Sequence, residues 1–116
     1  MAFGPDDVVR TVLAKPLRKV TAKTITNTKS LLAELASVRK QGWAAVPDEG
    51  AVGFNALACP VFDGQASLAP MVGVIAATRN LPQTPPRDLV RTLKTASLTI
   101  SRALGHAGGS TFPNRR

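Results

Sequence analysis

The stretch that decides the fold is VGFNALACPVFDGQASLAPMVGVIAA, which runs from Val52 to Ala77. It contains two apolar runs, Val52–Phe62 and Ala69–Ala77, separated by the polar turn Asp63-Gly64-Gln65. Such runs, bounded by turn residues, predict strands. Two strands with a short glycine-containing connection predict a hairpin, or two neighbouring strands of one sheet. Alternation between apolar and polar residues is weak in both runs, so we expect helices to bury both faces of the sheet.

The flanking sequence supplies three candidate helices. The first is expected over residues 5–14 because Pro5 suits a first helical position. The second should begin after Asn27 as N-cap and end at Gly42, which readily adopts the left-handed conformation. The third should run from Pro86 to Gly105, with an apolar stripe that consists of Leu89, Leu93, Ala96, Ile100 and Leu104.

Two shorter segments lie between these elements. Residues 17–25 are expected to form an extended connection or an edge strand, whose lysines would discourage pairing with another sheet. Residues 43–46 are expected to form a short strand that begins at Trp43. Together the segments predict an α/β (α+β) domain over residues 1–105, followed by a flexible tail over residues 106–116.

Composition narrows the class of protein. The chain has 116 residues, enough for one domain, and its net charge is +8 from 15 basic and 7 acidic residues. This charge indicates either a nucleic-acid-binding surface or a solvated basic exterior. One cysteine excludes an internal disulfide, and neither a signal peptide nor a run of about 18 apolar residues is present. We therefore expect a cytoplasmic protein with no membrane contact.

The residues that could carry chemistry are few. Asp48 and Glu49 sit in the turn Pro47-Asp48-Glu49-Gly50, where no further Asp, Glu, His or Cys is close in sequence, so a surface turn is favoured over a metal or acid–base site. Cys59 lies inside an apolar run with no base nearby, which favours a buried, inert thiol over a nucleophile. Phosphate-loop, nucleophile-elbow and metal-ligand patterns are absent from the sequence. The sequence predicts no enzyme activity, no metal and no cofactor.

The order of the remaining motifs resembles a known family. It comprises Thr21-x-x-Thr24-Ile25-Thr26-Asn27, Leu31, Leu32, Glu34 and Leu35, then Val38-Arg39-x-x-Gly42-Trp43, Glu49, Gly53, Ala58-x-Pro60-Val61-x-Asp63, and finally Ile100-Ser101-x-x-Leu104-Gly105. This order, over residues 4–105, resembles the C-terminal effector-binding domain of the IclR (isocitrate lyase regulator) transcription factors. The resemblance implies a GAF-like fold, with a mixed or antiparallel sheet flanked by helices. The front part of that domain and the winged helix-turn-helix that binds DNA would be missing, as in a truncated product, an expression fragment or a proteolytic remnant.

The resemblance also implies a pocket for a small-molecule effector on one sheet face. Polar groups hold effector carboxylates in the family, and the positions here that match them are Val46, Ala56, Gly73 and Ile75. All four are apolar, whereas Phe54 matches an apolar wall position. Because a buried carboxylate without donors is costly, the resemblance implies a hydrophobic pocket for an uncharged or aromatic molecule, or one that no longer binds a ligand.

Two functional hypotheses follow from different features. The motif order favours the ligand-sensing and oligomerising part of a bacterial DNA-binding transcriptional regulator, which would self-associate as a dimer or tetramer. On this view, DNA is bound only through a domain absent from this chain. The net charge favours the alternative, a small basic nucleic-acid-binding protein whose binding would weaken steeply with salt.

Overall fold

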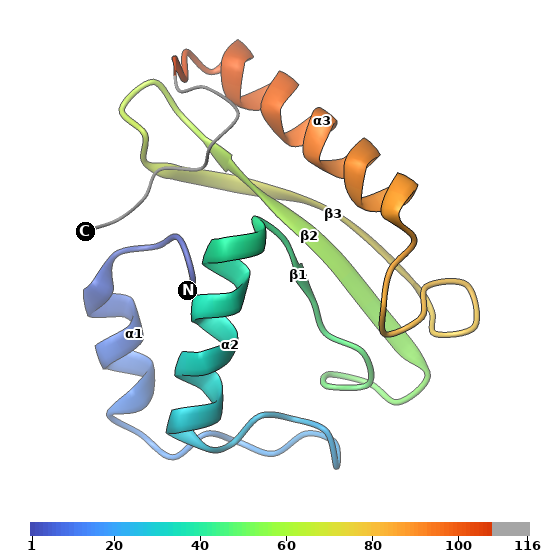
Figure 1. The fold of residues 1–116 in the computed structure, drawn as a ribbon. Coiled ribbons are helices and arrows are strands. Elements are labelled where there is room, and N and C mark those ends of the chain that lie inside the picture. Colours follow the sequence, from blue (N-terminus) through green and yellow to red (C-terminus); the bar gives the residue numbers. More distant parts are fainter. Residues whose placement is uncertain (108–116) are drawn as a thin grey trace.

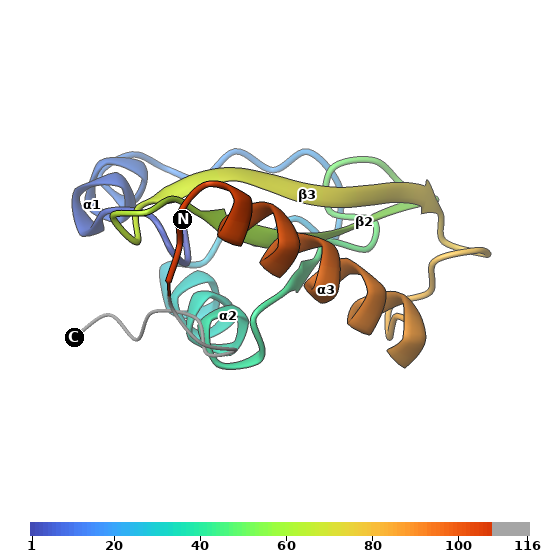
Figure 2. The same ribbon diagram turned by 90° about the horizontal axis from the view of Figure 1, so that it is seen from above.

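The computed structural model describes residues 1–107 and shows an α+β fold built on one antiparallel sheet. The sheet has three strands in the order β1-β2-β3, and the longest helix, α3, runs along β2 and β3 (Figures 1 and 2). The two other helices lie beside the β1 edge (Figure 1). The elements are α1 (Asp6–Leu13), α2 (Thr28–Gln41), β1 (Ala44–Ala45), β2 (Phe54–Phe62), β3 (Leu68–Ala77) and α3 (Arg87–Ala103).

The strands β2 and β3 form the predicted hairpin. Their register pairs Ala56 with Ile75 and Ala58 with Gly73, and it shifts at a bulge between Pro60 and Phe62. A proline cannot donate to the sheet ladder, so an irregularity next to Pro60 is expected. The turn is closed by Asp63, whose Oδ1 accepts hydrogen bonds from the backbone N–H groups of residues 65 and 67 at 2.9 and 3.0 Å.

One face of the sheet is covered by α3. Leu57 and Cys59 of β2 are fully buried there and pack in one cluster with Leu93 of α3 and Leu81 of the preceding loop. Asn55 lies among them and binds the same loop, since its Nδ2 donates to the carbonyl oxygens of residues 81 and 82, each at 3.2 Å. This cluster is the main core of the described chain.

The opposite face is largely open, so the prediction that helices bury both faces is wrong. Ile75 is 77% exposed, Met71 is 70% exposed and Phe54 is 53% exposed. The chain measures 40 × 35 × 19 Å, and its smallest dimension accommodates only a sheet and one layer of helix. The apolar runs therefore have one covered face and one exposed apolar face, which we call the open face.

The second helix begins and ends where its signals place it. The Oδ1 atom of Asn27 accepts a hydrogen bond from the N–H of Ser30 at 3.0 Å, and Gly42 terminates the helix at a φ of 82°. Leu35 and Val38 of this helix are buried against Ala2 in a second cluster, separate from the main core. The N-terminal segment is held there by Arg39, whose Nε donates to the Ala2 carbonyl oxygen at 2.7 Å.

The buried face of α3 differs from the predicted stripe in its C-terminal half. Leu93 is buried as expected, but Ile100 and Leu104 are exposed, and Ser97 and Ser101 are buried in their place. The Ser101 hydroxyl donates to the Ser97 carbonyl oxygen at 2.8 Å and accepts from the N–H of residue 62 at 3.0 Å. The Ser97 hydroxyl donates to the carbonyl oxygen of residue 60. The two serines thus bind the bulged end of β2, which explains why small polar side chains are buried here.

The remaining differences concern boundaries. Strand β1 covers two residues rather than 43–46, and residues 17–25 form turns and an extended connection without a strand. At the start of the predicted tail, the His106 ring lies against the Phe62 ring at a centroid distance of 5.6 Å, with the two planes tilted by 36°. Residues 108–116 of that tail lie outside the described part of the chain.

Candidate functional site

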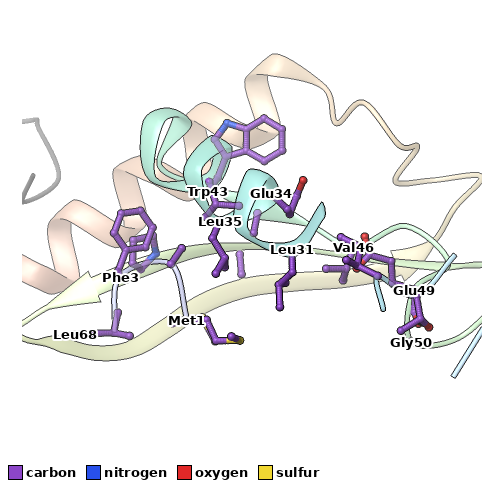
Figure 3. A pocket seen from close by; sticks show the side chains of 18 residues that line it. Met1, Phe3, Leu31, Glu34, Leu35, Trp43, Val46, Glu49, Gly50 and Leu68 are labelled. Carbon is purple, nitrogen blue, oxygen red and sulfur yellow. The ribbon is translucent and has the colours of Figure 1, made fainter. Parts of the chain in front are cut away.

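A pocket of about 480 Å³ lies where α2 and the N-terminal segment meet the sheet (Figure 3). We call it the α2 pocket. Most of its lining is apolar, and two of its residues, Glu34 and Glu49, are acidic. The lining is Met1, Ala2, Phe3, Thr24, Ile25, Leu31, Glu34, Leu35, Val38, Trp43, Ala44, Val46, Glu49, Gly50, Ala58, Pro60, Leu68 and Met71.

The helical repeat places Glu34 on this pocket. It follows Leu31 by three residues and precedes Val38 by four, so it lies on the apolar face of α2. That spacing is the signal in the sequence that could have identified it as a pocket residue. A carboxylate on the apolar side of a helix is an uncommon choice unless a charged or polar partner faces it.

The turn that carries Glu49 is fixed by two threonines from the segment before α2. The Thr21 hydroxyl donates to the carbonyl oxygen of Asp48 at 2.5 Å, and the Thr24 hydroxyl donates to that of Glu49 at 2.6 Å. The ammonium of Lys23 is 3.5 Å from the carboxylate of Asp48. These contacts explain the Thr-x-x-Thr motif, because it holds the backbone that presents Glu49 to the pocket.

The carboxyl group of Glu49 is affected by its burial and by the charge of Glu34. Partial burial raises the pKa of the Glu49 carboxyl above its ordinary value of 4.5, and the negative charge of Glu34 raises it further. No other acidic residue is close to the turn at Asp48 and Glu49 in the sequence, as expected. In the folded chain, however, Glu34 is close enough to affect Glu49. Glu34 comes from α2, which the fold brings to the turn after β1.

The five predicted pocket residues lie on the open face. Ala56 pairs with Ile75, and Gly73 pairs with Ala58, so these side-chain positions share one side of the hairpin with Phe54. Val46 joins the same row because its N–H donates to the Ala56 carbonyl oxygen at 3.1 Å. Among these five, Val46 alone lines the α2 pocket. The other four extend the apolar surface from the pocket across the open face.

The Cys59 thiol is buried in the main core. Burial raises the pKa of the Cys59 thiol to about 11, so it is almost entirely protonated at neutral pH. No group of three His, Cys, Asp or Glu residues within residues 1–107 could hold a metal ion. No helix in the same range is both long enough and apolar enough to cross a membrane.

A second hollow, of about 450 Å³, lies beside α3 on the other side of Trp43. Three basic residues of α3 line it, Arg87, Arg91 and Lys94. They account for part of the positive charge of the chain, and none of them lines the α2 pocket. The basic hollow beside α3 and the α2 pocket are therefore distinct, and among their lining residues they share Trp43.

The structure is therefore an α+β domain with a three-stranded antiparallel sheet, one covering helix and an apolar pocket beside the sheet. Residues 1–102 match the family model described as "Bacterial transcriptional regulator IclR C-terminal". The chain belongs to this family.

Individual relatives agree with the family. The chain is 31% identical over 108 residues to the DNA-binding transcriptional repressor YiaJ of Escherichia coli (strain K12), covering 90% of this chain and 38% of YiaJ. It is 29% identical over 107 residues to the transcriptional regulator KdgR of the same organism, covering 91% of this chain and 41% of KdgR. The crystal structure of the Thermotoga maritima IclR superposes with a TM-score of 0.82 at 29% identity, covering 90% of this chain and 43% of that one.

These relatives settle the choice between the two hypotheses at the level of family. They are transcriptional regulators, and the comparisons give no support to the alternative of a small basic nucleic-acid-binding protein. The chain spans about two fifths of the length of the curated regulators that it matches, 38% of one and 41% of the other.

Proposed function

We propose that this chain is the ligand-sensing and self-associating part of a bacterial transcriptional regulator, and that DNA is bound by a domain outside it. The observation that carries the proposal is the open face. Phe54, Met71 and Ile75 expose apolar side chains on one side of a sheet whose other side is fully packed. A contiguous exposed apolar surface marks a site for a ligand or for another protein chain.

The effector site in this proposal comprises the α2 pocket and the adjoining open face. Val46, Phe54, Ala56, Gly73 and Ile75 provide apolar walls and no side-chain hydrogen-bond donor. These five residues would therefore hold the uncharged or aromatic body of an effector by its shape and its apolar area. A carboxylate effector would be desolvated there without compensation.

Self-association would use the outer edge of β3. Within the described residues, β3 pairs with β2 on one side and with no strand on the other. Such an edge presents backbone donors and acceptors that can pair with a second copy. An effector that binds one arrangement of copies more tightly than another would shift their populations, and in this way would regulate DNA binding in the bacterial cytoplasm.

Sedimentation velocity tests this proposal. We expect the chain to sediment as a dimer or tetramer at about 50 μM, a concentration at which a contact of micromolar Kd is nearly saturated. Ile75→Lys places a charge on the open face of β3 and should shift the protein toward monomer. Val20→Lys is the control, since Val20 is 60% exposed and lies away from the sheet. A monomeric parent chain, or equal effects of the two substitutions, would contradict the proposal.

A further inference from the structure

The α2 pocket differs from the rest of the molecule in the sign of its charge. The chain carries 15 basic and 7 acidic residues, yet the only charged side chains among those that line this pocket are Glu34 and Glu49. Lys, Arg and His contribute no lining side chain. The lining side chains therefore carry only negative charge, and the one positive group on a lining residue is the α-amino group of Met1.

Neither carboxylate is neutralised by the protein. Within residues 1–107, the side chains of Glu34 and Glu49 form no hydrogen bond and no ion pair, whereas the nearest lysine of the adjoining segment, Lys23, pairs with Asp48. The raised pKa of Glu49 agrees with this geometry, because both partial burial and the charge of Glu34 disfavour its ionised form. A positively charged group placed here would favour the ionised form and offset both effects.

One end of the pocket is apolar, and the two acidic residues lie away from it. Figure 3 shows Phe3 and Leu68 at that end, Val46 and Glu49 at the opposite end, and Leu31 and Glu34 between them. A volume of about 480 Å³ is in the range of pockets that enclose small organic ligands. The complementary molecule has an apolar body and a donor group at one end.

We propose that the α2 pocket binds a small hydrophobic cation, a protonated amine on an apolar or aromatic body, with its ammonium group in the part of the pocket that Glu34 and Glu49 line. An ammonium has three N–H donors and no acceptor, so it matches two carboxylates that lack partners. This inference rests on the proposed function in one respect, that the bound amine would be the effector of the regulator. Binding of the amine itself does not depend on that role.

Three probes of nearly equal size isolate the charge of the ligand: 2-phenylethylamine, 2-phenylethanol and 3-phenylpropionate. Binding can be followed by titration calorimetry and by the fluorescence of Trp43, which is the single tryptophan of the chain and lines the pocket. We expect the amine to bind about tenfold more tightly than the alcohol, as a charge-assisted hydrogen bond provides, and the acid not to bind. Raising the salt concentration from 20 to about 500 mM should weaken only the amine.

Isosteric variants locate the site. Glu34→Gln and Glu49→Gln should each reduce the affinity for the amine about three- to tenfold and leave the affinity for the alcohol unchanged. Asp88→Asn is the matched control, because the Asp88 side chain is 93% exposed on α3 and does not line the pocket. Trp43 also borders the basic hollow beside α3, so these variants, rather than the fluorescence alone, assign the site.

The outcomes separate the inference from the proposed function. Equal binding of amine and alcohol, preference for the acid, or an amine affinity that both glutamine variants leave unchanged would overturn the inference. If the amine binds as expected but the sedimentation of the chain is the same with and without it, the pocket chemistry stands and the effector role fails. If the acid alone binds and shifts sedimentation, the effector role stands and the cation inference fails.

Discussion

Replacement of Gly73 by alanine should destabilise the domain, although alanine is the better residue for most strands. A Cβ atom at this position would lie 2.8 Å from the backbone carbonyl oxygen of Leu57 on the neighbouring strand, closer than such contacts occur. The backbone of a paired strand cannot move aside without disturbing the hairpin. Overpacking of this kind costs roughly 1–3 kcal/mol, whereas removing glycine from a strand gains about 0.5–1 kcal/mol.

The midpoints of these two ranges leave a net loss of about 1 kcal/mol of unfolding free energy, and their extremes allow at most about 2.5 kcal/mol. For a domain of this size it corresponds to a fall in Tm of roughly 5–10 °C. Thermal unfolding followed by circular dichroism measures it directly. Val52→Thr is the control, since Val52 is 77% exposed in the turn before β2 and threonine keeps the β-branched shape. We expect its Tm to stay within about 2 °C of the parent.

A Gly73→Ala variant as stable as the parent would refute the reasoning. A finer check uses Ala58→Gly, because the Ala58 Cβ is 3.4 Å from the added methyl group and is only a secondary contact. Combining the two substitutions should give additive losses. Rescue of Gly73→Ala by Ala58→Gly would show that the clash is with a side chain and not with the backbone of Leu57.

Three further predictions concern buried polar groups and ionisation. Ser97→Ala removes the hydroxyl that donates to the Pro60 carbonyl oxygen and should cost about 1 kcal/mol in a urea titration, with an unchanged m-value; an unchanged midpoint would contradict the role assigned to this bond. Cys59 should resist a thiol reagent at pH 8, where a pKa of about 11 leaves only about one thiol in a thousand ionised, and should react fully in urea; rapid labelling of the native chain would show that the strand is accessible. Because the pKa of Glu49 is raised in the fold, the folded state binds the extra proton and stability falls as pH rises through that raised pKa. Glu49→Gln should therefore increase Tm slightly at pH 7 and flatten its dependence on pH above 4.5, whereas a parallel pH profile for parent and variant would argue against burial of this carboxyl.

The sequence predicted the features that depend on neighbouring residues. The Asn27 cap and the Gly42 terminus are defined by local backbone geometry, and both are confirmed. The β2–β3 hairpin follows equally from two uncharged runs and the polar turn at Asp63. The motif order along the chain identified the IclR family, which the family match confirms.

Features that depend on distant contacts could not be predicted in this way. Ile75 belongs to a run without alternation, which is typical of a strand buried on both faces, but its exposure depends on what lies above the sheet. Ser97 and Ser101 are polar, so they are not part of the apolar pattern that predicts the buried face of α3. Their burial is explained by their hydrogen bonds to the backbone of β2. The proximity of Glu34 to Glu49 arises because the fold brings α2 to the turn after β1.

The separation of the two buried clusters has a consequence for cooperativity. Leu57 and Leu93 belong to one cluster and Leu35 and Val38 to the other, so α2 can open with the N-terminal segment while α3 stays on the sheet. The α2 pocket lies between these two parts of the molecule, because α2 and the N-terminal segment provide some of its lining and strands β2 and β3 provide more. A molecule bound there would hold α2 against the sheet. Hydrogen exchange of the backbone amides in α2 would then slow markedly, whereas exchange of the amides in the strands covered by α3 would hardly change. Binding of a ligand in the α2 pocket would then change how well ordered α2 is, without any movement of the sheet.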